Sequence, residues 1–336
     1  MRVVQDDVQR PSRRGFFMIA GSAAAVSSMP AAGRAKEPFR GVFTIPSTPF
    51  TANGAIDVPS FRRVIDFCIG CGAHGLVFPV NASEWSLLSD DERLKLDQVL
   101  VEQNAGRLPV VIGVNASTQE NAARFAAHAR SIGADAVMAM PPGGPQGDVS
   151  PGGIFNFYRK ISDAGRLPVF IQDHDPPVGT NMPAELMLKL CREIEHVKYI
   201  KEETTPSTFK TTAILKGGNG ICKGVFGGSG GRYLIEEYRR GCSGQMPGCH
   251  VTDVVVALWN ALEKHDEKRV LHIYKEMAPL FFFETQLNGS YKEVLLRRGV
   301  IACALKRNGA MPMDQIASRY LDEILKNLAP LMTWKR

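Results

Sequence analysis

Short apolar runs rich in β-forming residues alternate with longer amphipathic segments along nearly the whole chain, and this alternation restricts the fold more than any other feature. From Phe39 onward the runs predict eight strands, at residues 41–46, 75–79, 110–114, 136–140, 169–172, 198–202, 221–226 and 244–247. Segments of helical periodicity lie between them, at 58–71, 89–105, 118–132, 151–164, 183–193, 206–216, 230–240 and 250–264. Regular βα alternation predicts an α/β fold with a parallel sheet, and eight strands suffice for a closed (β/α)8 TIM barrel.

Helix-start signals support this division. Ser89 with Glu92 predicts a capping box, and Ser117 with Glu120 predicts a second one. Three further helices are predicted after the eighth unit, at 267–286, 290–305 and 313–330. We therefore expect a barrel at 36–265 and a C-terminal helical extension at 266–336. An open doubly wound sheet has the same periodicity and is the alternative, although no GxGxxG or GxxxxGK[ST] motif follows an early strand.

The N-terminus has a different character from the rest of the chain. Ser12-Arg13-Arg14-Gly15-Phe16-Phe17 precedes an apolar, Ala-rich stretch at 18–29 and small residues up to Ala35. This order resembles a twin-arginine export signal, so residues 1–35 are predicted to be a signal peptide and the mature protein to be periplasmic. The alternative is a basic tail followed by a short core helix.

Charge and cysteine content exclude several classes of protein. The net charge is +6, and residues 1–35 carry five arginines against two aspartates, so little excess charge remains for binding nucleic acid. The rest of the chain lacks an apolar run long enough to span a bilayer, so no membrane association is expected after processing. Seven scattered cysteines do not suggest a disulfide framework, and the CxxC pair Cys68 and Cys71 is expected to be packed in the core.

Chemistry in a barrel is expected at the carboxyl ends of the strands. Lys201 ends the sixth predicted strand, where period-two alternation puts it on the same side as Val197 and Tyr199. If that side is the barrel interior, desolvation favours the neutral amine that a Schiff base requires. The alternatives are a lysine in solvent or an ion pair with Glu202 or Glu203.

Several segments resemble the dihydrodipicolinate synthase and N-acetylneuraminate lyase family, in one collinear order from 39 to about 330. The matching residues are Gly41, Pro46-x-Thr48-Pro49-Phe50, Gly72-Ala73-His74-Gly75-Leu76, Glu84-x-x-x-Leu88-Ser89-x-x-Glu92-Arg93, Pro109–Val114 and Ile200-Lys201-Glu202. The resemblance implies that Lys201 forms the Schiff base of a class I lyase or aldolase. It also implies a small-molecule 2-keto acid as substrate, such as pyruvate or a keto-deoxy sugar acid, no cofactor, and a homotetramer.

Other family residues carry over less completely. The loop that holds the keto-acid carboxylate corresponds to Asn81, Ala82 and Ser83, with Gly228 of the Gly-rich segment after strand seven as a further donor. The family's proton-relay threonine would be Asn81, and its tyrosine after strand four is absent from Pro141-Pro142-Gly143. These departures predict that the chain is not an authentic dihydrodipicolinate synthase.

The family's main catalytic tyrosine aligns with Gln172 or Asp173, neither of which is a phenol. We predict Asp173 as a carboxylate acid/base, with Asp175 as the alternative, and Gln172 as a substrate hydrogen-bonding residue. Two other functions remain open. One is a metal-assisted lyase that uses the Asp173-His174-Asp175 segment with Glu202 or Glu203. The other is a non-catalytic periplasmic barrel that binds keto acids.

Overall fold

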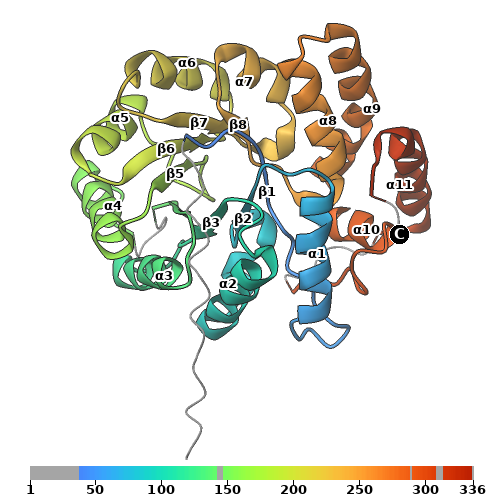
Figure 1. Ribbon diagram of the computed structural model, residues 1–336, viewed down its shortest axis with the longest axis horizontal. Helices are drawn as coiled ribbons and strands as arrows, with labels where there is room; N and C mark the ends of the chain where they lie inside the picture. Colours follow the sequence, from blue (N-terminus) through green and yellow to red (C-terminus); the bar gives the residue numbers. More distant parts are fainter. Residues whose placement is uncertain (1–37, 142–146, 288–289, 308–312, 335–336) are drawn as a thin grey trace, which may run out of the picture. The chain divides into compact units, whose positions relative to one another are not determined.

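The protein forms a closed barrel of eight parallel strands in chain order, in which β1 also pairs with β8 (Figure 1). This computed structural model describes residues 38–141, 147–287, 290–307 and 313–334, so the predicted signal peptide at 1–35 lies outside the described residues. The predicted TIM barrel is confirmed, and the alternative of an open sheet is wrong.

Helices and strands alternate as predicted. The strands are β1 (Gly41–Thr44), β2 (Gly75–Phe78), β3 (Val110–Gly113), β4 (Ala136–Ala139), β5 (Val169–Asp173), β6 (Val197–Glu202), β7 (Gly224–Gly227) and β8 (Gly244–Gln245). The barrel helices are α1 (Val58–Gly70), α2 (Asp90–Asn104), α3 (Gln119–Ser131), α4 (Pro151–Gly165), α5 (Ala184–Glu193), α6 (Ser207–Gly217), α7 (Leu234–Arg240) and α8 (Thr252–Glu263). The C-terminal extension contains α9 (Glu267–Gln286), α10 (Ser290–Arg297) and α11 (Gln315–Leu328).

Local hydrogen bonds explain where the boundaries differ from the predictions. The seventh strand begins at Gly224 rather than at residue 221, because the amides of Ile221 and Cys222 both donate to the Gly218 carbonyl and close a turn. The predicted capping box of Ser89 and Glu92 is present at the start of α2. The second predicted capping box is wrong by one residue, since Thr118 caps α3 instead.

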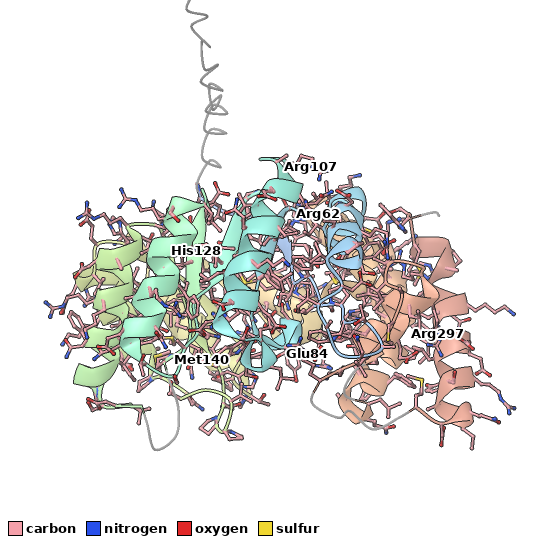
Figure 2. All side chains as sticks on the ribbon, turned by 90° about the horizontal axis from the view of Figure 1, so that it is seen from below. Arg62, Glu84, Arg107, His128, Met140 and Arg297 are labelled. Atoms are coloured by element: carbon pink, nitrogen blue, oxygen red, sulfur yellow. The ribbon has the colours of Figure 1, made fainter. Side chains whose placement is uncertain are left out.

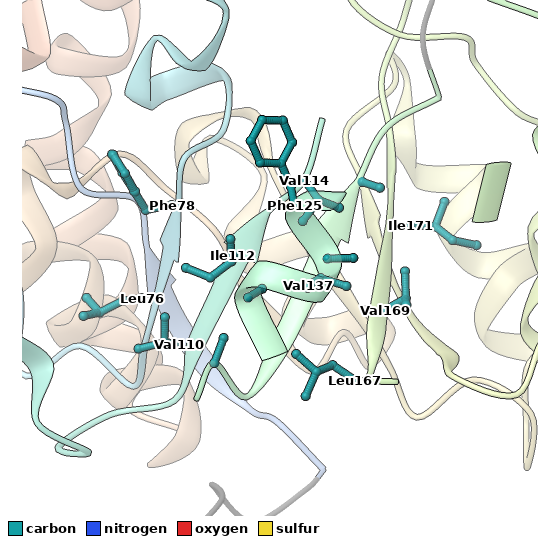
Figure 3. Close-up of a cluster of buried hydrophobic side chains, with 14 of the residues drawn as sticks. Leu76, Phe78, Val110, Ile112, Val114, Phe125, Val137, Leu167, Val169 and Ile171 are labelled. Atoms are coloured by element: carbon teal, nitrogen blue, oxygen red, sulfur yellow. The ribbon is translucent and has the colours of Figure 1, made fainter. Parts of the chain in front are cut away.

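Two apolar layers hold the barrel together. Alternate strand residues fill the interior, including Phe43, Phe170, Tyr199 and Phe226, whose rings pack against one another. The intervening residues face the helices and form the outer layer, part of which is drawn in Figure 3. Alternation along β5 therefore places Phe170 inside and Ile171 outside.

Strand β6 departs from this alternation at its start. Its register with β5 shifts between Val169 and Phe170, so that Val169 pairs with Val197 but Phe170 pairs with Tyr199. As a result Val197 packs in the outer layer and Tyr199 in the interior. The prediction that Val197 shares a side with Lys201 is wrong, whereas Tyr199 and Lys201 do share the interior side.

The carboxyl ends of the strands define one face of the barrel. Figure 2 labels Glu84 and Met140, which follow β2 and β4, at this face, and Arg107, which precedes β3, at the opposite face. No helix in the described part of the chain has both the length and the apolar character needed to cross a bilayer.

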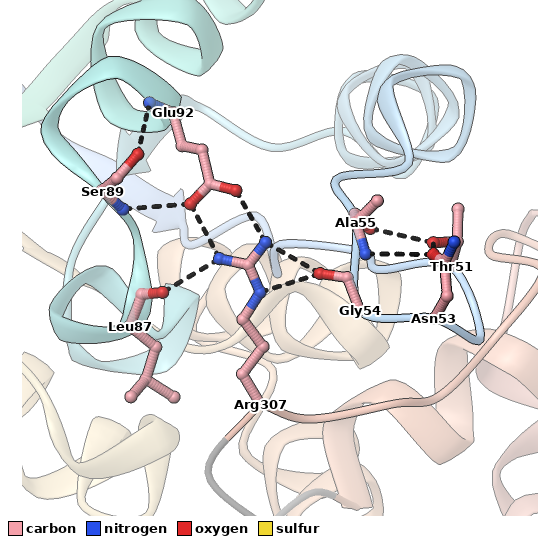
Figure 4. A network of polar contacts seen from close by, with 8 residues as sticks. All are labelled: Thr51, Asn53, Gly54, Ala55, Leu87, Ser89, Glu92 and Arg307. Atoms are coloured by element: carbon pink, nitrogen blue, oxygen red, sulfur yellow. Dashed lines mark hydrogen bonds and ion pairs between the residues drawn. The ribbon is translucent and has the colours of Figure 1, made fainter.

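A single arginine ties the C-terminal extension to the rim of the same face (Figure 4). Arg307 donates to both carboxylate oxygens of Glu92, at 2.6 and 2.7 Å, and to the carbonyls of Leu87 and Gly54, at 3.0 and 2.8 Å. The guanidinium therefore joins three segments that are far apart in the sequence.

Candidate active site

Lys201 lies inside the carboxyl end of the barrel beside a carboxylate. Its Nζ is 3.0 Å from Oε2 of Glu203, and both side chains are almost fully buried. The two predicted alternatives thus occur together, because Lys201 faces the interior and also forms an ion pair. The partner in this ion pair is Glu203 and not Glu202, because alternation along the strand places Glu202 on the outer side.

Glu203 has a second partner from the neighbouring strand. Nε2 of Gln172 donates to Oε1 of Glu203 at 2.6 Å, while Oε1 of Gln172 is buried without a partner among the described residues. Burial by itself would raise the pKa of Glu203, but the Lys201 ammonium and the Gln172 amide outweigh burial, so the net pKa is lowered. Glu203 is therefore an anion at neutral pH, positioned to accept a proton from the lysine.

Gly228 leaves the space that Glu203 occupies. A Cβ atom at position 228 would lie 2.2 Å from Oε2 of Glu203, so only glycine fits here without a shift. The Gly228 carbonyl accepts a hydrogen bond from Nε2 of Gln245 at 2.5 Å. Glu237 lies behind this loop, and burial raises its pKa to about 8, so it is mainly a neutral acid that can hydrogen-bond Gln245.

Asp173, the predicted acid/base, lies on the other side of β5. Its carboxylate accepts from the Met182 amide at 2.8 Å and pairs with Nζ of Lys210 at 2.8 Å. Glu202 shares this outer side, where burial and the nearby Asp173 charge raise its pKa to about 8. The structure does not bring Asp173 to Lys201, because adjacent strand residues face opposite ways.

The residues proposed as metal ligands also diverge. The Asp175 carboxylate accepts from Nδ2 of Asn181 and from the Thr205 amide, both at 2.7 Å, whereas Asp173 is held by Lys210. The described residues contain no group of three or more His, Cys, Asp or Glu side chains arranged to hold a metal ion. The segment 173–175 therefore does not assemble the ligand set that a metal-assisted lyase requires.

The predicted carboxylate-binding loop is a single 3-10 turn after β2, at Asn81–Ser83. Asn81 and Ala82 line a cavity of about 260 Å³, and the first amides of such a turn have no acceptor within it. Ser83 serves the loop itself, because its Oγ donates to the Pro46 carbonyl at 2.8 Å and its own carbonyl accepts from Thr48 at 2.6 Å. Asn81 and Ala82 are thus available to a ligand, and the Ser83 side chain is not.

The extension supplies the opposite wall of this cavity. Glu284 of α9, and Ser290, Tyr291 and Lys292 of α10, line it together with the barrel residues Ser47 and Glu84. The Tyr291 ring covers Gly248, and its hydroxyl lies 3.3 Å from the point where a Cβ on Gly230 would stand. Tyr291 therefore spans the loops after β7 and β8 at the mouth of the barrel.

A larger cavity of about 530 Å³ lies between the β2–α2 loop and α3, lined by residues such as Trp85, Arg93 and Phe125. It contains neither Lys201 nor Glu203. Lys201 and Glu203 are absent from the lining of the smaller cavity as well, but its Tyr291 hydroxyl lies beside Gly230, next to Ser229, whose amide donates to Oε2 of Glu203 at 3.4 Å. We therefore assign the chemistry to the smaller cavity.

Two functional roles were not predicted from the sequence, which named Glu203 only as an ion-pair partner or metal ligand and did not name Tyr291. Glu203 follows from continuing the alternation one step beyond the strand, since Lys201 and Glu203 then share a side. Tyr291 gave no such signal, because helical periodicity does not show which end of the barrel an extension covers.

Comparison with known proteins places this geometry in a family. Residues 38–327 match the model of the dihydrodipicolinate synthetase family. The L-2-keto-3-deoxyarabonate dehydratase of Azospirillum brasilense is 32% identical over 297 residues, which are 87% of this chain and 96% of the relative. The probable 2-dehydro-3-deoxy-D-pentonate aldolase of Escherichia coli is 29% identical over 164 residues, 49% of this chain and 54% of the relative.

A solved structure supports the same fold. The dihydrodipicolinate synthase of Rhodopseudomonas palustris superposes with a TM-score of 0.79 at 24% identity, covering 86% of this chain and 97% of that one. The family match over residues 38–327 and the relative that is 32% identical establish that the chain belongs to the dihydrodipicolinate synthetase family.

Proposed function

We propose that the protein is a class I lyase that forms an imine between Lys201 and a keto-deoxy sugar acid. The observation that carries the proposal is the buried contact of 3.0 Å between Nζ of Lys201 and Oε2 of Glu203. It puts a nucleophile and a proton acceptor within hydrogen-bond reach of each other. The names of the relatives, a dehydratase and an aldolase of keto-deoxy pentonates, support the substrate class.

The residues divide the chemistry as follows. Glu203 takes a proton from Lys201, and the neutral amine attacks the C2 carbonyl of the keto acid. Glu203 returns the proton to the carbinolamine hydroxyl, which leaves as water and yields the imine. Asn81 and Ala82 hold the substrate carboxylate through their amides, and Gln172 holds Glu203 in position.

The next step depends on the substrate. Glu203 removes a proton from C3, and the imine nitrogen accepts the electron pair to give an enamine. In a dehydration the C4 hydroxyl then leaves with that proton as water. In an aldol cleavage Glu203 takes the proton of the C4 hydroxyl instead, the C3–C4 bond breaks, an aldehyde departs, and the enamine that remains takes that proton at C3 to become an imine. Hydrolysis of the remaining imine restores Lys201.

Borohydride trapping tests the proposal. Incubation with a keto-deoxy pentonate or pyruvate and borohydride should add the mass of the reduced adduct to the peptide that contains Lys201. The variant Lys201→Arg should fold and give no adduct, because arginine remains charged. If the wild-type protein binds keto acids without any adduct, it is a non-catalytic keto-acid-binding barrel, and the proposal is refuted.

The departures from the family's proton-relay residues support a function other than dihydrodipicolinate synthesis. The positions of the family's relay tyrosines hold Gln172 or Asp173 and Gly143 or Pro142, and a positioned acid/base group contributes about 10²–10⁴-fold to rate. We expect negligible condensation of pyruvate with aspartate semialdehyde by residues 36–336. Rescue of a lysine auxotroph by that segment would contradict this expectation.

Export by the twin-arginine route, a periplasmic location and a homotetramer are also part of the proposal. The first two rest on Arg13-Arg14 and Phe16-Phe17 of the N-terminal segment. The tetramer rests on the family resemblance alone.

A further inference from the structure

The cavity of about 260 Å³ has polar walls with balanced charge, because its lining contains the carboxylates of Glu84 and Glu284 and the ammonium groups of Lys292 and Lys306. Glu84 pairs with Lys292 at 2.5 Å, and Glu284 pairs with Nε2 of His250 at 2.5 Å. The second carboxylate oxygen of Glu284 is 3.8 Å from the Arg232 guanidinium. Because two lysines face two carboxylates, the lining offers hydrogen bonds without a large surplus of either charge.

This balance selects among ligand ends. A second carboxylate on the substrate would meet the carboxylates of Glu284 and Glu84 as well as the lysines of the lining, so the balanced charge gives it no net attraction. A hydroxyl group donates to a carboxylate oxygen and accepts from a phenol, so the same wall suits it. Burial and the Glu284 charge raise the pKa of Tyr291, which keeps the phenol a donor at neutral pH.

Two buried atoms in this region still lack partners. Oε2 of Glu84 and Nδ1 of His250 have no hydrogen bond among the described residues. Glu84 lines the cavity, and its unpaired Oε2 is buried in the cavity wall. His250 stands behind the wall, where its ring stacks on Tyr291 with centroids 4.1 Å apart while its Nε2 bonds Glu284.

We propose that Glu284 and Tyr291 of the C-terminal extension form a subsite for the hydroxyl-bearing end of the substrate, positioned by His250. This inference rests on the proposed function, because the keto-acid end must be fixed at Lys201. Imine chemistry then belongs to β5–β7, whereas the choice of a polyhydroxylated chain belongs to α9 and α10.

The test compares two keto acids that share the reacting end. Pyruvate has no hydroxyl, and 2-keto-3-deoxyarabonate carries two. Borohydride trapping at Lys201, followed by mass spectrometry, gives the half-saturating concentration for each. In Glu284→Gln and Tyr291→Phe we expect that concentration to rise about 10-fold or more for the sugar acid, since a bond to a charged group is lost or weakened, and to change less than about 3-fold for pyruvate.

Matched controls on the same extension are Glu323→Gln and Tyr320→Phe, whose side chains are exposed on α11 and should leave both concentrations unchanged. His250→Gln should raise KM for the sugar acid and leave kcat within about 3-fold, as expected of a positioning residue. Thermal melting checks that each variant is folded.

Each outcome decides the question. If the half-saturating concentrations for pyruvate and the sugar acid rise equally in the variants, or if neither changes, the subsite is refuted and the proposed function stands. If the wild-type protein is trapped by no keto acid, the proposed function fails and the subsite with it.

Discussion

Replacing Glu203 with glutamine isolates the role of its charge. The side chain keeps its size and retains a carbonyl oxygen for the Gln172 amide, but it can no longer accept a proton. Two unit charges 3.0 Å apart attract by about 5–6 kcal/mol at an effective dielectric constant of about 20, and that attraction is lost. The Lys201 ammonium then lacks its counter-ion, which favours the neutral amine that attacks the keto acid. We therefore expect imine trapping with pyruvate to persist.

Turnover should respond differently, because every later step needs a proton to move. Loss of a positioned acid/base group predicts a fall in kcat of about 10²–10⁴-fold for keto-deoxy pentonate turnover, which product release measures directly. Glu202→Gln is the matched control. Glu202 lies on the outer side of the barrel, and its pKa of about 8 already keeps it largely neutral at pH 7. A kcat within 3-fold of wild type for Glu203→Gln, or an equal fall in both variants, would refute the assignment.

Three further perturbations follow from the structure. Gly228→Ala should displace the Glu203 carboxylate and lower kcat at least about 10-fold, whereas Gly152→Ala, where an added Cβ meets only one atom at 4.0 Å, should not. Because the Glu237 pKa rises from 4.5 to about 8 on folding, the free energy of unfolding should fall by up to about 1.4 kcal/mol per pH unit between those values. Glu237→Gln should flatten this loss in urea titrations at pH 6 and pH 8, and an unchanged slope would contradict it. Replacing both Arg13 and Arg14 with lysine should leave an unprocessed precursor in the cytoplasm. Normal export of this variant would show that the segment is not a twin-arginine signal.

The fold was largely predictable because the local hydrophobic periodicity of the sequence indicates each strand and helix. Strands β1 to β4 and β7 are short, mainly apolar runs buried on both sides, and the helices begin at recognisable caps such as Ser89. The family and its lyase class, predicted from the segments around Pro46 and Lys201, are confirmed by the match over residues 38–327. The register shift between β5 and β6 was not predicted, since period-two alternation assumes an unbroken strand.

The site was predictable only where it follows the strands. Lys201 and Gln172 share the interior because each lies two residues beyond an interior aromatic, Tyr199 and Phe170. Asp173 was singled out for its chemistry, although the same alternation directs it outward. Contacts that depend on the path of the extension, such as that of Tyr291, need the three-dimensional structure.

The Arg307 contacts have a consequence for recombining members of this family. The Arg307 guanidinium joins the C-terminal extension to the turn at Gly54 and to the N-terminus of α2 through Glu92. A C-terminal extension exchanged between members, residues 266–336, would bring with it the proposed substrate-selecting wall. It would pack correctly only on a barrel that has the same carboxylate and carbonyl acceptors for Arg307. In chimeras that receive Arg307 without its acceptors, the transferred extension should pack poorly against the barrel. A change of substrate preference in this fold therefore requires transfer of both the extension and the barrel segment that contains Gly54 and Glu92.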